Sequence, residues 1–176
     1  RICPMEKDCS HIRERSSACC STSGGGGRWA VAESLDEVEF HRSLAGAALS
    51  NDIFRMQHLL RRGIPVDMPD ANGYTPLHYA ARNGYLEACL LLLENGAQVD
   101  KCTRSGKATS LHRAAYAGQI EVVKALLKAG ADVFKEDADG LRPVEKAEAQ
   151  GHVEIVKLLV DAACKLERKV KDTDCF

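Results

Sequence analysis

The chain has 176 residues, of which 45% are hydrophobic and 28% charged, and its formal net charge at pH 7 is −1. This composition is that of an ordinary soluble domain with flanking segments, and the near-neutral charge argues against nucleic-acid binding through bulk positive charge. No apolar run in the sequence approaches the length of about 18 residues that a membrane-spanning helix needs, so we expect neither nucleic acid nor a membrane as a partner.

Residues 1–33 are rich in Ser, Cys and Gly and show no helical periodicity, so we expect a disordered leader and linker. Five of its side chains belong to the types that bind zinc: Cys3, Cys9, His11, Cys19 and Cys20. These side chains form no Cys-x-x-Cys pair, and two adjacent cysteines are poorly placed to hold one ion. We therefore expect no metal or other cofactor, and a metal- or redox-responsive leader stays as an alternative.

The eight cysteines form no compact disulfide framework, because half of them lie in the leader and Cys89 falls in an apolar stretch. The sequence also shows no secretory hydrophobic region. Both features favour reduced thiols, and hence a location in the cytoplasm, the nucleus or both.

A folded domain is expected to begin at Ser34, because Ser34 and Glu37 have the spacing of a helix capping box. Apolar residues then recur at helical spacing through Ala48, which predicts a helical cap at the start of the domain.

One sequence segment of this domain is repeated several times. Residues 74–84 return as residues 108–118, and weaker copies stand at 141–151 and 44–51. The period of about 33 residues indicates a stack of small units, a kind of architecture that usually binds other molecules.

Each copy predicts two helices. Thr75 can cap the first helix and Pro76 suits its first position. Three glycines are expected to end the first helices: Gly84, Gly118 and Gly151. The second helices are predicted over residues 86–94, 120–128 and 153–161. The left-handed position after a second helix is assigned to Gly63, Gly96 and Gly130. The loop that contains Gly106 has one extra residue, so we expect it to differ in shape from the turns at 70–73 and 137–140.

The period, the Thr-Pro-Leu-His sequence at 75–78 and the Ala-Ala-x-x-Gly sequence at 80–84 resemble the ankyrin repeat. The resemblance implies an all-α solenoid of about four helix-turn-helix units with projecting β-hairpin loops. The units are placed at residues 34–66, 67–99, 100–133 and 134–164, followed by a charged tail at 165–176 that we expect to fray. The first and last copies depart most from the pattern, as the terminal units of a stack do.

His78 and His112 occupy equivalent positions of the two strong copies. In ankyrin repeats this histidine bonds neighbouring backbone or threonine and ties turns together, so the resemblance implies a structural role. No nucleophile with an orienting acid has a recognisable spacing around them, and we expect the chain not to be an enzyme.

The resemblance also places partner binding on the projecting loops and on the exposed positions of the first helices. The side chains expected to contact a partner are Asn72, Tyr74, Arg82, Asn83, Arg104, Lys107, Tyr116 and Asp139. Arginine and tyrosine are over-represented among residues that dominate binding energy. For Tyr74 and Tyr116, shielding of a loop base is the alternative role.

The charges of this surface are uneven along the stack. Its middle is basic, with Arg82, Arg104, Lys107 and Arg113, and its C-terminal end is acidic, with Glu136, Asp137 and Asp139. We therefore expect a monomeric adaptor or scaffold whose protein partner offers acidic and apolar residues. A small inhibitor of a kinase or transcription factor is an alternative that the sequence leaves open.

Overall fold

The computed structural model describes residues 35–173, so the predicted leader, the cap at Ser34 and the last three residues lie outside the described part. The helices within residues 35–173 are α1 (Leu35–Arg42), α2 (Leu44–Leu49), α3 (Ile53–Arg61), α4 (Pro76–Asn83), α5 (Leu86–Glu94), α6 (Ser110–Ala117), α7 (Ile120–Lys128), α8 (Pro143–Ala149) and α9 (Val153–Thr173). No strand occurs among these described residues.

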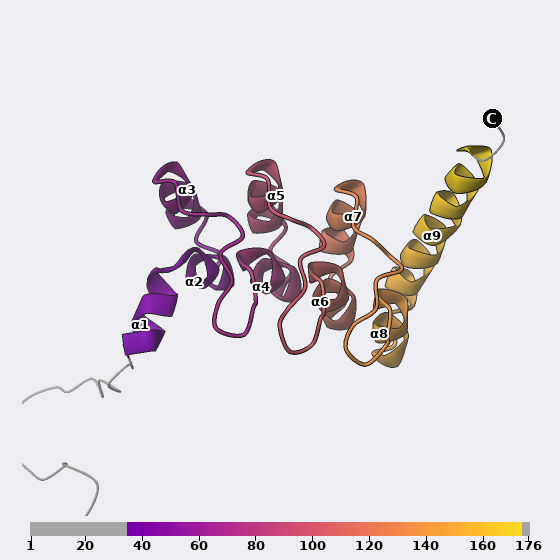
Figure 1. Cartoon of the computed structure of the whole chain (residues 1–176), viewed down its shortest axis with the longest axis horizontal. Coiled ribbons are helices and arrows are strands. Elements are labelled where there is room, and N and C mark those ends of the chain that lie inside the picture. Colours follow the sequence, from indigo (N-terminus) through magenta and orange to yellow (C-terminus); the bar gives the residue numbers. More distant parts are fainter. Residues whose placement is uncertain (1–34, 174–176) are drawn as a thin grey trace, which may run out of the picture. The chain divides into compact units, whose positions relative to one another are not determined.

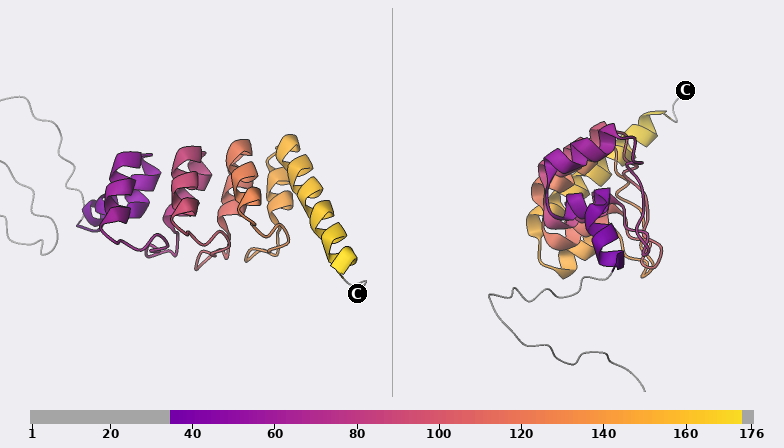
Figure 2. Two further views of the ribbon diagram at one scale, coloured as in Figure 1. Left: turned by 90° about the horizontal axis from the view of Figure 1, so that it is seen from above. Right: turned by 90° about the vertical axis from the view of Figure 1, so that its left-hand side faces the viewer.

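The helices pack in two rows (Figure 1). Helices α2, α4, α6 and α8 contact one another in sequence along the first row, and α3, α5, α7 and α9 do the same along the second. Each helix of the first row also contacts the next helix in the chain, and α1 packs on α2. The loops that lead from one helix pair to the next project to the same side (Figure 2). The predicted all-α solenoid of four helix pairs is confirmed.

The first helices begin as the repeat predicts. Thr75 and Thr109 stand at the N-caps of α4 and α6 with extended backbones, and Pro76 occupies the first turn of α4. In the first unit the cap is Ser43, whose hydroxyl accepts the Gly46 N–H at 3.1 Å. Gly46 also permits the close approach of α1, because a Cβ there would lie 2.3 Å from the carbonyl oxygen of Phe40.

Glycines set where most of the other helices end. Gly84 and Gly118 cap α4 and α6 with φ of 78°. Gly63, Gly96 and Gly130 follow the second helices with φ of 80°, 84° and 89°. Side chains other than glycine rarely adopt this left-handed conformation, so these positions stop a helix and redirect the chain.

Helix α9 is the exception, and its predicted end at residue 161 is wrong, because the helix continues to Thr173. The position that corresponds to Gly63, Gly96 and Gly130 is occupied by Ala163, a strong helix former. No glycine or proline follows it before the helix ends. The charged segment that was expected to fray is therefore helical through Thr173. Whether it stands outside the functional domain stays a prediction.

The projecting loops are tight turns, which we call finger 2 (residues 70–74), finger 3 (residues 103–108) and finger 4 (residues 137–141). Each is closed by a backbone hydrogen bond between its ends, for example from Asp70 N–H to the Tyr74 carbonyl at 2.9 Å. Finger 3 contains the extra residue, and Lys107 takes a positive φ of 46° where fingers 2 and 4 have glycine. The predicted difference in shape is confirmed.

The core runs through all units. Small side chains are fully buried in the first helices: Ala47, Ala48, Ala80, Ala81, Ala114, Ala115 and Ala147. The second helices contribute larger ones: Met56, Leu92, Leu126 and Leu159. Complete burial of one such large side chain contributes about 1.5–3 kcal/mol. The alanines let neighbouring units approach closely, and large side chains from both rows complete one continuous core, including Leu44, Leu77 and Leu111 of the first helices.

Candidate recognition surface

The two repeated histidines join successive units. Nδ1 of His78 accepts hydrogen bonds from the N–H and the hydroxyl of Thr75 at 3.2 and 2.8 Å, so the ring proton resides on Nε2. That N–H donates to the carbonyl oxygen of Ala108 in the next unit at 3.1 Å. His112 repeats the arrangement with Thr109 and with the Leu141 carbonyl. The predicted structural role of both histidines is confirmed.

Both imidazoles are held neutral. Burial lowers the pKa of His78 from 6.5 to about 4 and also lowers the pKa of His112. The positive charge of Arg113 lowers both pKa values further. Because both ring nitrogens of each histidine are engaged in hydrogen bonds, neither imidazole offers a free lone pair to a metal or a substrate.

The residue after the histidine position faces the finger of its own unit. In unit 2, the Tyr79 hydroxyl donates to Oδ2 of Asp70 at 2.6 Å, and burial followed by this hydrogen bond raises the pKa of Tyr79. In unit 4, Nζ of Lys146 lies 2.7 Å from Oδ2 of Asp137, which raises the pKa of Lys146. Partial burial works to raise the pKa of Asp137, but the bonds from Lys146 and from the backbone outweigh it and the pKa is lowered.

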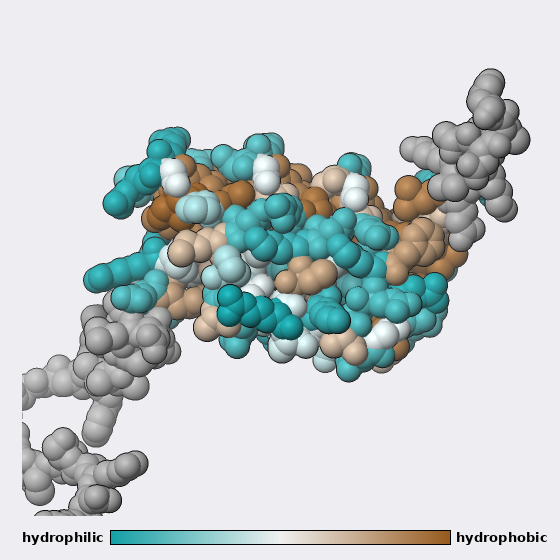
Figure 3. Space-filling model, viewed as in Figure 1, coloured by the Kyte–Doolittle hydropathy of each residue, from teal (hydrophilic) through white to brown (hydrophobic). Residues whose placement is uncertain are grey.

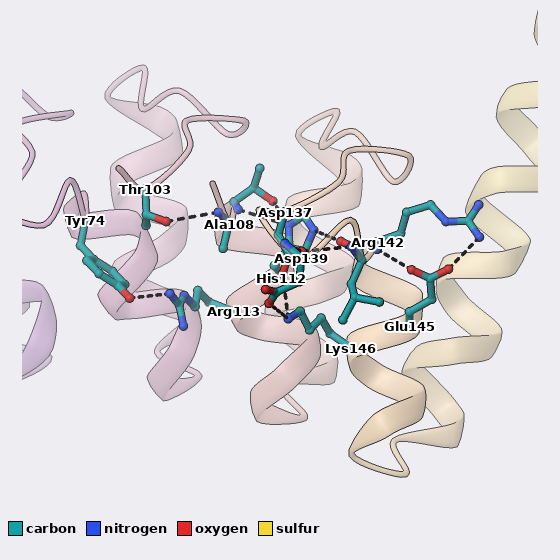
Figure 4. A network of polar contacts seen from close by, with 12 residues as sticks. Tyr74, Thr103, Ala108, His112, Arg113, Asp137, Asp139, Arg142, Glu145 and Lys146 are labelled. Atoms are coloured by element: carbon teal, nitrogen blue, oxygen red, sulfur yellow. Dashed lines mark hydrogen bonds and ion pairs between the residues drawn. The ribbon is translucent and has the colours of Figure 1, made fainter. Parts of the chain in front are cut away.

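Unit 3 breaks this pattern. Thr103 stands where units 2 and 4 have Asp70 and Asp137, and the residue after His112 is Arg113. The Arg113 guanidinium reaches back to finger 2, donates to the Tyr74 hydroxyl and lies 4.9 Å from the centre of the Tyr74 ring (Figure 4). No carboxylate lies within 4.0 Å of it among the side chains that the structure describes. Arg113 is thus a cation without an acidic partner in the described structure.

A pocket of about 190 Å³ opens beside this arginine, between fingers 3 and 4 and helices α6 and α8. Its wall includes Arg113, Lys146, Asp137 and the two predicted residues Tyr116 and Asp139. Tyr116 is 51% exposed, so its ring is available for contact with a partner. Figure 3 shows mainly hydrophilic residues over the fingers and first helices, below a hydrophobic band at the level of the second helices.

The other predicted residues occupy different parts of the surface. Tyr74 does not line the pocket, but its hydroxyl accepts from Arg113 and its ring packs edge-on against His78. Arg104 rests on finger 2, where its N–H donates to the Asn72 carbonyl at 3.2 Å. Gly73 makes this contact possible, since a Cβ there would lie 2.7 Å from the Arg104 nitrogen.

Arg82 and Asn83 lie in the last turn of α4, and Lys107 is exposed on finger 3; none of the three lines the pocket. Lys146 was missing from the predicted set and Arg113 was seen only as part of a basic region. The repeat could have indicated both, because residues 79, 113 and 146 share one position of the repeat, as do residues 70, 103 and 137.

The next feature is the set of cysteines and other side chains that could bind a metal. Burial raises the pKa of the Cys89 thiol to about 12, and Cys102 and Cys164 are exposed and free. The side chains that the structure describes include no group of three placed to hold a metal ion. The zinc candidates Cys3, Cys9, His11, Cys19 and Cys20 lie outside the described residues. None of the helices described here is both long enough and apolar enough to cross a membrane.

Comparison with protein families decides the class of the chain. A model of three ankyrin repeats matches residues 44–137 and again residues 100–172. The chain belongs to the ankyrin repeat family. Ankyrin repeat proteins generally mediate protein–protein interaction, and the family is generally non-enzymatic.

Individual relatives match only in part. Ankyrin repeat domain-containing protein 39 of Homo sapiens is 44% identical over 73 residues, which is 42% of this chain and 40% of the relative. Its counterpart in Bos taurus is 44% identical over 55 residues, which is 31% of this chain and 30% of the relative. Ankyrin repeat domain-containing protein 37 of Xenopus tropicalis is 35% identical over 60 residues, which is 34% of this chain and 37% of the relative. The chain spans less than half the length of these curated relatives.

Proposed function

We propose that this ankyrin repeat chain is a non-enzymatic adaptor that binds a segment of a partner protein across fingers 2–4 and the neighbouring ends of α4, α6 and α8. We call this area the recognition surface. The observation that carries the proposal is the polar surface around Arg113, whose charge lacks an acidic partner in the described structure while exposed Tyr116 stands beside it.

The fingers suit this role because they are held in place before a partner arrives. The Arg104 N–H bonds finger 2 and the Ala138 N–H bonds the Gly106 carbonyl at 2.9 Å, so finger 3 is tied to both neighbours. A pre-organised surface loses less conformational entropy on binding. We further propose that the chain acts as a monomer in the cytoplasm or nucleus, where the exposed thiols of Cys102 and Cys164 would stay reduced.

The test is affinity capture from cell lysate with mass spectrometry, using the full chain and the Arg82→Glu/Arg104→Glu variant. We expect this charge reversal to remove the specific partners, because both arginines are exposed on the proposed surface. The matched control is Arg61→Glu/Lys128→Glu, which makes the same charge change at exposed positions of α3 and α7. Partners that survive the first variant, after its fold is verified by circular dichroism, would contradict the proposed surface.

A further inference from the structure

Unit 3 lacks the contact between a finger carboxylate and the residue after the histidine position that units 2 and 4 have. Among the described side chains, Arg113 is therefore left without a negative charge to balance it at this point of the recognition surface. In units 2 and 4 a finger carboxylate accepts a hydrogen bond from the residue after the histidine position. In unit 3 that carboxylate is replaced by the Thr103 hydroxyl, which is occupied by the Ala108 N–H at 3.2 Å. Thr103 Oγ1 and Nη2 of Arg113 both lie within 4 Å of the place that a Cβ on Gly106 would take. The missing carboxylate would therefore have stood close to Arg113.

Most hydrogen-bond donors of the Arg113 guanidinium have no acceptor within the described part of the chain. Of its five N–H groups, one donates to a residue of the described part, and the acceptor is the Tyr74 hydroxyl. Its Nε is buried and has no hydrogen-bond partner within the described part of the chain. Stacking against the Tyr74 ring keeps the group in place beside the pocket. An arginine held in this way has donors and charge available for an anion.

We propose that the pocket between fingers 3 and 4 receives a carboxylate side chain, Asp or Glu, of the partner segment, and that Arg113 binds it. This inference rests on the proposed function and names the chemistry that the partner brings to it. The partner's carboxylate replaces, between molecules, the contact that Asp70 and Asp137 make within units 2 and 4.

The pocket favours a carboxylate over a phosphate group. The planar guanidinium matches the two oxygens of a carboxylate. Asp137 and Asp139 also line the pocket and already engage Lys146 at 2.7 and 3.3 Å. A phosphate dianion would meet these two negative charges with about twice the repulsion that a carboxylate meets.

The test uses a random peptide display library selected on the full chain. We expect peptides enriched by the wild-type protein to share an acidic residue at one fixed position. The decisive variant is Thr103→Asp, which supplies the carboxylate that units 2 and 4 possess. We expect it to remove the acidic preference while the protein melts at the same or a higher temperature, because Arg113 is then paired internally. Thr103→Asn is the matched control, with nearly the same shape and no charge, and should keep the preference.

A selected peptide then gives the size of the effect. Changing its acidic residue to the amide should weaken binding to the wild type about tenfold or more, as expected for a hydrogen-bonded charge. The same change should matter much less for Arg113→Gln, and Arg113→Lys should fall between the two because it keeps the charge without the planar fork. These peptide comparisons decide the matter even if Thr103→Asp does not fold.

Several results would overturn the inference. Selected peptides without a fixed acidic position, or an acidic preference that persists in Thr103→Asp and Arg113→Gln, would show that Arg113 is not the anchor. Tighter binding of a peptide with phosphoserine at the acidic position would assign the pocket to phosphate instead. If peptides without an acidic preference still lose binding in Arg82→Glu/Arg104→Glu, the proposed function stands and this inference alone fails. If no peptide binds the surface, both fail.

Discussion

At the scale of single residues, the most constrained side chains are the two histidines that join units. Each replaces the glutamate of an ordinary capping box, since His78 accepts from the Thr75 N–H as a glutamate would. Unlike glutamate, the ring has a second nitrogen, and it donates to Ala108 in the next unit. One neutral side chain thus caps its own helix and holds the following finger, which explains why burial of an ionisable group is tolerated here.

This burial predicts a dependence of stability on pH. The pKa of His78 is about 4 in the folded chain and 6.5 ordinarily, so the unfolded chain binds a proton more readily. The part of the free energy of unfolding that comes from neutral His78 is therefore complete above about pH 6.5 and is lost as the pH falls towards 4. Below about pH 4 the free energy of unfolding changes no further on account of His78. The loss is about 3 kcal/mol for His78. Urea unfolding between pH 7.5 and 4 measures it.

The control for this prediction is His78→Gln, which removes the titrating group. We expect the variant to be less stable than the wild type at pH 7.5 but to lose less stability between pH 6.5 and 4. If the wild type and the variant showed the same slope over this interval, protonation of His78 would not be the cause.

At the scale of helices and turns, single positions decide where an element stops. Gly63, Gly96 and Gly130 end the second helices in a left-handed conformation, whereas Ala163 at the corresponding position lets α9 continue to Thr173. Finger 3 shows the same principle, since one inserted residue shifts the left-handed conformation onto Lys107. The end of α9 and the shape of finger 3 therefore each depend on a single position.

Replacing Ala163 by glycine tests this account of α9. Glycine inside a helix costs about 1 kcal/mol relative to alanine, and here it also restores the stop signal of the other units. We expect Ala163→Gly to lower the helix signal in circular dichroism and to speed amide hydrogen exchange in residues 164–173. Unchanged exchange in this segment would mean that its helix does not depend on the missing glycine.

At the scale of the whole described unit, stability comes from contacts between neighbouring units. The helices of each row contact the next helix of that row, and α9 closes the second row by packing on α7. Among the side chains of α9 whose burial the structure describes, Ile155 and Leu159 are buried, and both lie in its first half. The remainder of α9 extends past these contacts, so the stack should depend on the first half of the helix far more than on the second.

Two truncations test this dependence. Ending the chain after residue 164 keeps Ile155 and Leu159, and we expect the melting temperature to change by only a few degrees, as for a loss of about 1 kcal/mol. Ending it after residue 134 removes α8 and α9 and exposes the buried side chains of α6 and α7. That truncation should lower the melting temperature much further and increase binding of a hydrophobic dye. A large loss in the first truncation would place the end of the domain beyond residue 164.

Most of the fold could be predicted from local signals. The bounds of α5 and α7 match the predicted ranges 86–94 and 120–128, because caps and left-handed glycines act on neighbouring residues only. The role of His78 followed from the family resemblance for a similar reason, since its partner Thr75 is three positions away. The end of α9 lies beyond the predicted residue 161, because neither Ala163 nor any residue from there to Thr173 is a glycine or proline that would stop the helix.

The sequence alone was sufficient for the class of the protein and the number of units, since both follow from a short pattern that repeats. The state of Arg113 was decided by the tertiary structure. Its contact with Tyr74 joins residues 39 positions apart on two different units, and its unpaired charge depends on which side chain the neighbouring finger presents. Such a charge is a property of the packed stack, because whether a cation is compensated depends on distances that only the fold establishes.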